Sequence, residues 1–364
     1  MKYLDEFRDS KLADGLVKKI RAMSRQKYSF MEVCGTHTFT ILRSGIKDLL
    51  RDEINLISGP GCPVCVTSTQ DVDKAIGITR MEEVILATFG DMLKVPGSSS
   101  SLQKEKAEGR DIRVVYSSLD ALKIAGENPR KKVVLLAIGF ETTAPTIASA
   151  ILTAINTGLS NFFILSLHKL IPPAMKALLD MGEIKLHGFI CPGHVSTIIG
   201  STPFQFIAKD YGIPCVITGF EPLDVLQAIF ILLSQKKENK SQVMIQYKRA
   251  VPRQGNPVAL DLMNEVFQKC DSRWRGLGTI PGSGLGLRDK YKRFDGEDLF
   301  DIPEAEVKDP PGCICGEILR GIKEPVDCEL FGTSCHPYNP IGPCMVSSEG
   351  SCAAHYHHNR REDR

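Results

Sequence analysis

The sequence predicts an α/β protein in which two related parallel-sheet α/β domains face a cleft and a loop-rich C-terminal domain follows. Three observations lead to this fold. Short, almost wholly apolar runs alternate with helical stretches between about residues 54 and 235, which is typical of parallel strands buried on both faces. Part of this pattern occurs twice. After residue 250 the periodicity weakens, and glycine, proline and cysteine become more frequent.

Composition and charge narrow the class of protein. The 364 residues are 43% hydrophobic and 24% charged, as in ordinary globular proteins. The formal charge is +2, and no basic block suggests a nucleic-acid or membrane surface. The N-terminal segment lacks the apolar core of a secretory signal, and the uncharged stretches 142–167 and 186–208 are too polar or too broken for membrane spans. We therefore expect a cytoplasmic protein that binds neither nucleic acid nor membrane.

The elements are expected in the following order. Residues 1–29 form an N-terminal helical segment, because apolar residues recur at helical spacing up to Met23. The first α/β domain is expected at 30–155, the second at 156–250, and a cysteine-rich domain at 251–364. The predicted strands are 54–58, 84–88, 112–116, 133–138, 162–166, 188–191, 215–218 and 243–247.

An internal repeat is the reason for expecting two related domains. The segment VVLLAIGFETTAPTIASAI at 133–151 resembles CVITGFEPLDVLQAIF at 215–230. Each is a predicted strand, then Gly-Phe-Glu, then a helix that begins near a proline. ISGPGCPVC at 57–65 similarly resembles FICPGH at 189–194. The alternative is that any two strand–turn–helix units look alike, and the sequence leaves both interpretations open.

Side chains suited to chemistry follow the predicted strands. Ligands of open α/β sheets bind beyond the carboxyl ends of the strands. The residues at such ends are Cys62, Cys65, Asp91, Glu141, Thr142, Thr143, His168, His194 and Glu221. Two domains facing each other would line one cleft with these groups. For Asp91, Thr142 and Thr143 the alternative is a structural role as a helix cap or turn residue.

The unusual feature of the composition is 12 cysteines, six of which lie in the last 52 residues. In a reducing cytosol such a cluster binds metal or takes part in redox chemistry more often than it forms structural disulfides. Four thiolates can come from Cys313, Cys328, Cys335 and Cys352. Four thiolates indicate an iron–sulfur cluster or an all-thiolate zinc site, and their wide spacing favours the cluster. Cys315 and Cys344 remain as an extra pair.

Two further motifs contain the N-terminal cysteines. Cys62 and Cys65 stand in Gly-Pro-Gly-Cys-Pro-Val-Cys after a predicted strand, where the backbone N–H groups at a helix start would lower a thiol pKa. We expect metal or redox chemistry there, and the alternative is a structural turn. In Cys-Gly-Thr-His, Cys34 and His37 could serve one metal, or the imidazole could deprotonate the thiol. This motif supports a functional site only if the fold brings Cys34 close to Cys62 and Cys65.

Other candidates have a structural interpretation. The glycine-rich segment 282–286 lacks the spacing of a dinucleotide-binding loop and is predicted to be a turn. Cys191, Cys215 and Cys270 are expected to be buried as small apolar residues. The polar C-terminal tail is expected to leave its three histidines solvated, namely His355, His357 and His358.

Taken together, the motifs resemble the HypD family of [NiFe]-hydrogenase maturation factors. The matching segments are MEVCGTHT (31–38), GPGCPVC (59–65), TFGDMLKVPGS (88–98), GFETTAPT (139–146), CPGHVS (191–196), GFEPLD (219–224), CICGEILRG (313–321) and PCMVSSEGSCAA (343–354). They occur in order along nearly the whole chain, and no motif cysteine departs from the pattern. The resemblance is therefore specific.

The resemblance implies a scaffold with thiol redox activity, rather than an enzyme of conventional turnover, that assembles the Fe(CN)2CO group of the hydrogenase. It implies a monomer that works in a complex with the small chaperone HypC and receives cyanide from HypE, with HypF acting upstream. Carried over by position, Cys34 resembles the thiol that holds Fe(II) with its CN and CO ligands. Cys62 and Cys65 resemble a redox pair in the same cleft.

The resemblance also implies a resident [4Fe–4S] cluster. Its ligands would be Cys313, Cys328, Cys335 and Cys352. Cys315 and Cys344 resemble a second redox pair beside it, through which electrons would reach Cys62 and Cys65. Soft thiolates suit the electron-rich iron that cyanide and CO require.

Residues around the expected iron site complete the hypothesis. His37 or His194 would orient or protonate the bound group. The cleft would be shaped by Asp91, Glu141, Thr142 and Thr143. The alternative function is a stand-alone iron–sulfur thiol–disulfide oxidoreductase, which needs Cys62 and Cys65 but not Cys34. A third interpretation is a structural protein with zinc on four thiolates.

Overall fold

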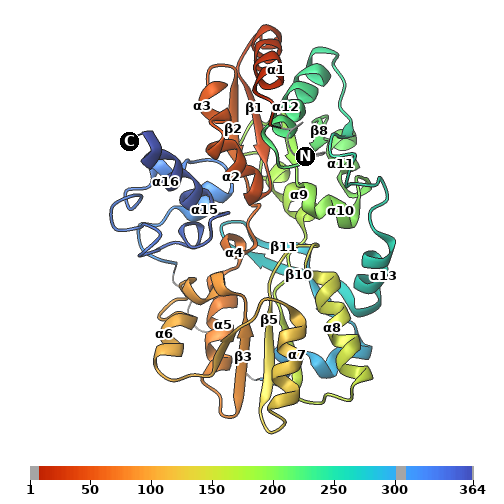
Figure 1. Cartoon of the computed structure of the whole chain (residues 1–364), viewed down its shortest axis with the longest axis vertical. Helices are drawn as coiled ribbons and strands as arrows, with labels where there is room; N and C mark the ends of the chain where they lie inside the picture. Colours follow the sequence, from red (N-terminus) through yellow and green to blue (C-terminus); the bar gives the residue numbers. More distant parts are fainter. Residues whose placement is uncertain (1–7, 301–308, 363–364) are drawn as a thin grey trace.

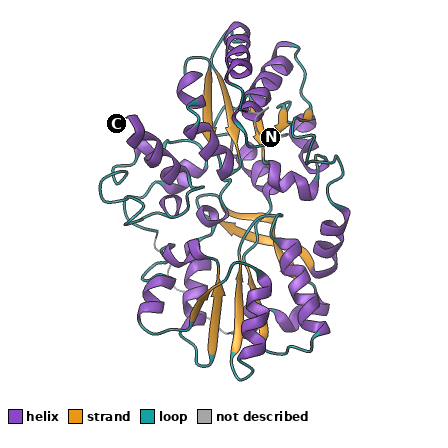
Figure 2. Ribbon diagram, in the orientation of Figure 1, coloured by secondary structure: helices purple, strands orange, loops and turns teal. Residues whose placement is uncertain are grey.

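The computed structural model describes residues 8–300 and 309–362, and it has two separate parallel sheets (Figures 1 and 2). The five-stranded sheet has the order β2-β1-β7-β8-β9, and the four-stranded sheet has the order β4-β3-β5-β6. An antiparallel ribbon of β10 (Phe267–Trp274) and β11 (Gly278–Leu287) lies between them in Figure 1. The predicted α/β class with parallel sheets is confirmed.

The five-stranded sheet is covered on one face by α1 (Ser10–Met23) and α12 (Pro222–Lys237), which pack on each other. Its strands are β1 (Tyr28–Glu32), β2 (Ile54–Ser58), β7 (Gly188–Cys191), β8 (Cys215–Ile217) and β9 (Val243–Ile245). Helix α1 starts where the Asp9 carboxylate accepts hydrogen bonds from the backbone N–H groups of Lys11 and Leu12. The part of the predicted helical segment 1–29 before residue 8 lies outside the described residues, and its end is corrected because the strand β1 already begins at Tyr28.

The four-stranded sheet shows why the predicted strands are mostly apolar. Its strands are β3 (Val84–Thr88), β4 (Ile112–Val114), β5 (Lys132–Ala137) and β6 (Phe162–Ser166). Val133 and Leu135 of β5 pack against α7 (Ser118–Glu127), α8 (Ala144–Asn156) and α13 (Pro257–Val266). Val134 and Leu136 face the opposite side, toward α5 (Thr69–Thr79) and α9 (Ile171–Met181). Both faces are therefore buried.

The strands are divided between the sheets differently from the expected boundaries 30–155 and 156–250. β1 and β2 pair with β7, so the five-stranded sheet draws strands from both sides of residue 155. β6 pairs with β5 and completes the four-stranded sheet. The chain leaves the first sheet after β2 and returns after β6. A strand that is buried on both faces carries no local signal for its neighbour, which is why the sequence pattern did not place it.

The segment 282–286 is part of strand β11 rather than the predicted turn. A Cβ added at Gly284 would lie 2.8 Å from the Cβ of Ser272 on β10. Gly284 therefore permits the close approach of the two strands of the ribbon.

The remaining helices are short. They are α2 (Gly35–Arg43), α3 (Ile46–Leu49), α4 (Pro63–Val66), η2 (Gly90–Lys94), α6 (Leu102–Ala107), α10 (Gly193–Ile199), η3 (Thr202–Phe204), α11 (Gln205–Asp210), η4 (Asp289–Phe294), α14 (Gly296–Leu299), α15 (Cys315–Leu319), η5 (Pro325–Asp327), η6 (Pro343–Met345) and α16 (Ser351–Glu362). Helix α16 packs on α2, so the C-terminal segment returns to the start of the chain (Figure 1). Within the described ranges, no helix has both the length and the hydrophobicity to cross a bilayer.

Candidate functional site

The pairing of β1 with β2 brings Cys34 beside the loop 59–65. Both strands end in register, so Cys34 and Cys62 lie just beyond neighbouring carboxyl ends. The backbone N–H of Gly35 donates to the carbonyl oxygen of Gly61 at 2.9 Å. Gly61 lies so close that a Cβ added to it would be 2.1 Å from the Cys34 backbone nitrogen. The fold therefore brings Cys34 to the segment that contains Cys62 and Cys65, and we call these three residues the N-terminal trio.

Cys34 is a buried thiol among carboxylates. Its backbone N–H donates to Oε2 of Glu32 at 2.9 Å. Burial, followed by the charges of Glu32 and Glu349, raises the pKa of Cys34 to about 12. Burial also raises the pKa of Glu32 to about 7, although the hydroxyl of Thr38 donates a hydrogen bond to it. Cys34 is thus a neutral thiol at pH 7, and a cation beside it would favour the thiolate.

Glu349 is the residue of this site that the sequence analysis did not single out. Its Oε1 accepts a hydrogen bond of 2.8 Å from the hydroxyl of Thr36. Its backbone packs on Gly35, where an added Cβ would lie 2.4 Å from the Glu349 carbonyl oxygen. Its charge contributes to raising the pKa of each thiol of the N-terminal trio. One signal in the sequence could have indicated Glu349: it is the only acidic residue between Cys344 and Cys352.

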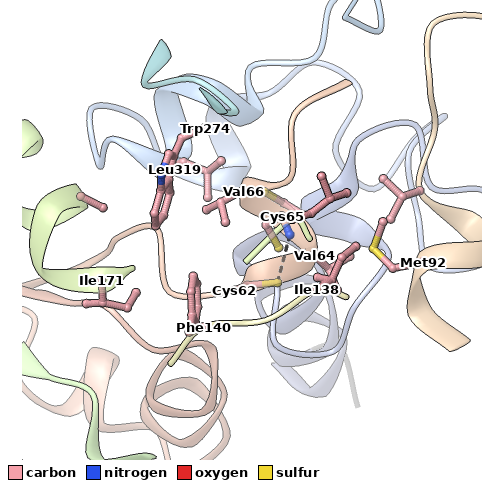
Figure 3. Close-up of a cluster of buried hydrophobic side chains, with 14 of the residues drawn as sticks. Cys62, Val64, Cys65, Val66, Met92, Ile138, Phe140, Ile171, Trp274 and Leu319 are labelled. Atoms are coloured by element: carbon pink, nitrogen blue, oxygen red, sulfur yellow. Dashed lines mark hydrogen bonds between the residues drawn. The ribbon is translucent and has the colours of Figure 1, made fainter. Parts of the chain in front are cut away.

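Cys62 and Cys65 differ in how readily they ionise. The backbone N–H of Cys65 donates to Sγ of Cys62 at 3.3 Å (Figure 3). Burial acts to raise the pKa of Cys65, but hydrogen bonds from the thiols of Cys344 and Cys62 lower it to about 6. Burial, together with the hydrogen bond to Cys65 and its charge, raises the pKa of Cys62 well above its usual value. The thiolate therefore forms at Cys65, mainly because of neighbouring thiols rather than the short helix α4.

The loop after β5 meets the loop after β2 at this place. Figure 3 shows Phe140, which follows β5 of the four-stranded sheet, beside Cys62, which follows β2 of the five-stranded sheet. Phe140 also stacks on Trp274 of the ribbon, with ring centroids 6.1 Å apart. Residues beyond the carboxyl ends of strands from both sheets thus pack together at the N-terminal trio.

His37 and His194 both stack on Phe220, at centroid distances of 4.8 and 3.9 Å. Nε2 of His37 lies 3.0 Å from the carbonyl oxygen of Gly219. A carbonyl only accepts, so Nε2 carries the proton. Nδ1 is buried and has no hydrogen-bond partner among the described residues. Burial lowers the pKa of His37 to about 4, so the ring is neutral and its free nitrogen accepts. His194 is exposed.

The predicted site residues that follow strands of the four-stranded sheet differ in their surroundings. Asp91 is exposed and Thr142 is half-buried. Thr143 occupies the N-cap position of α8, yet its hydroxyl donates back to the carbonyl oxygen of Phe140 at 3.2 Å and forms no cap bond. Oε1 of Glu141 accepts from the backbone N–H of Ile171 at 3.1 Å. Glu141 also lines a separate cavity of about 800 Å³ between α9, α13 and the ribbon.

All six C-terminal cysteines line one small cavity of about 10 Å³. They are Cys313, Cys315, Cys328, Cys335, Cys344 and Cys352. Sγ of Cys315 and Sγ of Cys344 are 2.7 Å apart. The backbone N–H of Ile341 donates to Sγ of Cys335 at 3.4 Å. The fold therefore gathers cysteines that are up to 39 residues apart in the sequence.

Cys344 connects this cavity to the N-terminal trio. Hydrogen bonds with the thiols of Cys315, Cys352 and Cys65, in that order of effect, raise the pKa of Cys344 well above its usual value. Cys65 in turn hydrogen bonds with Cys62. Helix α4 and η6 are packed together at this contact. The thiols thus form an unbroken series from Cys62 to Cys315.

The six thiols around this cavity are more than one metal ion uses. Among the described residues, no three His, Cys, Asp or Glu side chains are close enough to hold a single ion. Tetrahedral zinc with bonds of about 2.3 Å would place its sulfurs about 3.8 Å apart. Cys315 and Cys344 are closer than that, so they are suited to each other rather than to one metal. The four other thiols around the same cavity are the number that a [4Fe–4S] cluster uses.

Three structural expectations are corrected. Cys191 and Cys215 are buried as predicted, but Cys270 is exposed on β10. His355 is buried, and burial lowers its pKa to about 3. His358 lies in contact with Asp48, with Nε2 and Oδ2 2.8 Å apart. Both histidines differ from the solvated tail because α16 packs on α2.

Comparisons with known proteins agree with this arrangement. A family model named HypD and described as "Hydrogenase formation hypA family" matches residues 11–359. The chain is 49% identical to the hydrogenase maturation factor HypD2 of Bradyrhizobium diazoefficiens, covering 100% of this chain and 98% of that protein. It is 48% identical to HypD of Rhizobium leguminosarum bv. viciae, covering 99% and 96%. It is 47% identical to HypD of Cupriavidus necator, covering 100% and 98%.

Proposed function

Since the chain belongs to the HypD family and acts in hydrogenase maturation, we propose that it is the scaffold on which the Fe(CN)2CO group is assembled. Iron is the substrate, and Cys34 holds it. The observation that carries this proposal is the contact of the Cys34 segment with Gly61 and Glu349, which places one isolated thiol beside a redox-capable pair. A cleft between the two α/β units, with an iron–sulfur domain within 251–364, is part of the same proposal.

Iron binding at Cys34 requires the loss of a proton. Because the pKa of Cys34 is raised to about 12 by burial and neighbouring carboxylates, the thiol stays protonated until a cation arrives. The neutral His37 has an acceptor nitrogen, Nδ1, with no partner in the part of the chain that the structure describes. We therefore assign His37 the role of accepting a proton or hydrogen bond in the site, and not that of donating one.

The unbroken series of thiols supports the transfer of two electrons from the pair Cys315 and Cys344 to the pair Cys62 and Cys65. The Cys344 thiol loses its proton as it attacks Sγ of Cys65 in a Cys62–Cys65 disulfide; the Cys344–Cys65 bond forms, the Cys62–Cys65 bond breaks, and Cys62 leaves and takes up a proton. Cys315 then attacks Cys344 after losing its proton, which forms the Cys315–Cys344 disulfide and releases Cys65 as a thiolate. The low pKa of Cys65 makes it a good leaving group in this second step.

A [4Fe–4S] cluster would be held by Cys313, Cys328, Cys335 and Cys352, and when bound it supplies single electrons. The backbone N–H of Ile341 would orient the sulfur of Cys335. The partners in this proposal are a HypC-type chaperone that shares the iron and a HypE-type cyanide donor, with a HypF-type protein upstream. The chain would act as a monomer in that complex, in the cytoplasm.

Infrared spectroscopy tests the proposal, because cyanide and CO stretches occur where protein does not absorb. The chain is purified without oxygen together with its HypC-type partner. We expect cyanide and CO bands for the wild type and for the control Cys270→Ala, and no bands for Cys34→Ala. The same bands in Cys34→Ala would show that Cys34 does not hold the iron. Absence of bands with every partner would contradict the scaffold function.

A second function, a stand-alone thiol–disulfide oxidoreductase, is favoured by the unbroken series of thiols from Cys62 to Cys315. Such an enzyme needs Cys62 and Cys65 but not Cys34. Reduction of a protein disulfide by the pre-reduced chain, unchanged in Cys34→Ala and lost in Cys65→Ala, would favour this function. Infrared bands that depend on Cys34 would favour the scaffold.

A further inference from the structure

Strand β9 is an edge of the five-stranded sheet, and its outer side is open. The carbonyl oxygen of Gln242 accepts from Cys215, and the N–H of Gln246 donates to Ile217, so both groups point toward β8. Backbone groups of a strand alternate in direction. Met244 therefore also faces β8, whereas the N–H and C=O groups of Val243 and Ile245 point away from it. The described strands include no partner for that side.

A cavity of about 670 Å³ runs along this free edge. The three β9 residues line it, together with the α11 side chains Gln205 and Lys209. The segment after β9 contributes Lys248, Val251 and Arg253. The cavity therefore offers room beside four outward-pointing backbone groups.

The charge around this cavity has one sign. Lys209, Lys248 and Arg253 line it, and no aspartate or glutamate does. All three cationic residues are exposed. Within the described ranges none of the three forms an ion pair, whereas the nearby Lys240 and Arg249 are paired with Glu238 and Asp224. The uncompensated positive charge is thus concentrated on the side of the strand that is open.

We propose that the free edge of β9 binds an extended acidic peptide segment, which adds to the five-stranded sheet as a sixth strand. The backbone groups of Val243 and Ile245 would bind the peptide backbone, as in other cases of strand addition. Lys209, Lys248 and Arg253 would select carboxylate side chains. The site lies at β9, the opposite edge of the sheet from β2. Because it does not involve the iron chemistry, a test of this site does not depend on whether the proposed function is correct.

The probe is a fluorescently labelled peptide that alternates glutamate with valine or isoleucine, titrated into the full-length chain at low salt. We expect saturable binding, read as fluorescence anisotropy, that weakens as salt screens the charges. The double variant Lys209→Glu/Lys248→Glu changes only exposed side chains, so it should fold normally. It should bind the acidic peptide at least about tenfold more weakly and should bind the matching lysine peptide instead.

Two further samples separate strand addition from simple charge attraction. The acidic peptide with alternate backbone nitrogens methylated cannot donate to the edge, and it should bind at least about tenfold more weakly. The variant Val243→Pro removes one outward N–H, which edge strands tolerate, and it should weaken binding while leaving the thermal unfolding midpoint nearly unchanged. Equal binding of the methylated peptide would overturn strand addition. No binding of the acidic peptide, or a dimer of the chain that buries this edge, would overturn the proposed occupant.

Discussion

The hydroxyl of Thr36 donates a hydrogen bond of 2.8 Å to Oε1 of Glu349, across 313 residues of sequence. This bond attaches the C-terminal segment to the first turn of α2, directly after Cys34. The negative charge of Glu349 acts to raise the pKa of all three thiols of the N-terminal trio. The ionisation of the N-terminal site is therefore partly controlled by the C-terminal segment.

Neutralising Glu349 should make the trio more reactive. In Glu349→Gln the amide oxygen can still accept from Thr36, but the negative charge is gone, so the pKa of Cys34 falls from its value of about 12. Each unit of fall raises the thiolate fraction at pH 8 about tenfold. The rate at which a small thiosulfonate forms a mixed disulfide with Cys34, releasing its sulfinate, is followed by mass spectrometry and measures this. The exposed Glu238→Gln is the control and should not change the rate, and an unchanged rate in Glu349→Gln would contradict the charge effect.

Glycines at the contacts of Cys34 should not tolerate a side chain. A Cβ at Gly35 or Gly61 would lie 2.4 or 2.1 Å from backbone atoms that cannot move away easily. We expect Gly35→Ala and Gly61→Ala to lose about 1–3 kcal/mol of unfolding free energy in denaturant titrations. Gly15 has open space around its Cβ position within α1. The control Gly15→Ala should instead gain about 0.5–1 kcal/mol, and similar losses in all three variants would refute the packing argument.

Removal of Cys344 should raise the pKa of Cys65. Burial opposes ionisation of Cys65, and the thiol of Cys344 is the largest of the influences that lower its pKa to about 6. In Cys344→Ala the midpoint of thiolate absorbance assigned to Cys65 should move up by about one pH unit or more. Cys215→Ala removes a buried thiol elsewhere and serves as the matched control. A midpoint that stays near 6 in Cys344→Ala would mean that the series of thiols is not electrostatically connected.

Metal analysis tests the C-terminal cysteine site. An iron–sulfur cluster predicts about four iron and four sulfide per chain after anaerobic purification. Cys352→Ser should lose most of both, because a ligand is removed, whereas Cys270→Ser on the exposed ribbon should keep them. Treatment with a chelator and an oxidant should remove iron and sulfide together. Zinc without sulfide in the wild type would contradict the cluster.

The buried Glu141 predicts a pH-dependent gain of stability on substitution. Burial raises its pKa to about 7 in the folded chain, against about 4.5 when unfolded. Between these values the folded state binds more protons, so this group makes the fold less stable as the pH rises. Glu141→Gln should therefore equal the wild type at pH 4.5 and exceed it above pH 7, on the order of 1–3 kcal/mol. A constant difference between pH 4.5 and pH 8 would exclude the protonation argument.

The sequence alone determined most of the parallel strands and the cysteines of the candidate site. Strands at 54–58, 84–88, 162–166 and 188–191 were predicted at the residues where they occur, because continuous apolar runs between turn residues are a local signal. The family could also be predicted from the sequence alone, because the ordered motifs around the cysteines are a property of the sequence. Strand β1 was not predicted. The ribbon of β10 and β11 was not predicted either, because its strands are rich in polar residues and glycine.

Only the tertiary structure decided which of these residues meet. In the folded chain β1 pairs with β7, and Glu141 lines a cavity of its own. Glu349 packs on Gly35, the residue that follows Cys34. The tertiary structure also made His37 a neutral acceptor and Cys65 the thiol that ionises first. Strand pairing, burial and charge interactions are set by neighbours far apart in the sequence. The local sequence pattern therefore identifies the side chains that can react. Packing between residues far apart in the sequence determines their protonation states and their contacts.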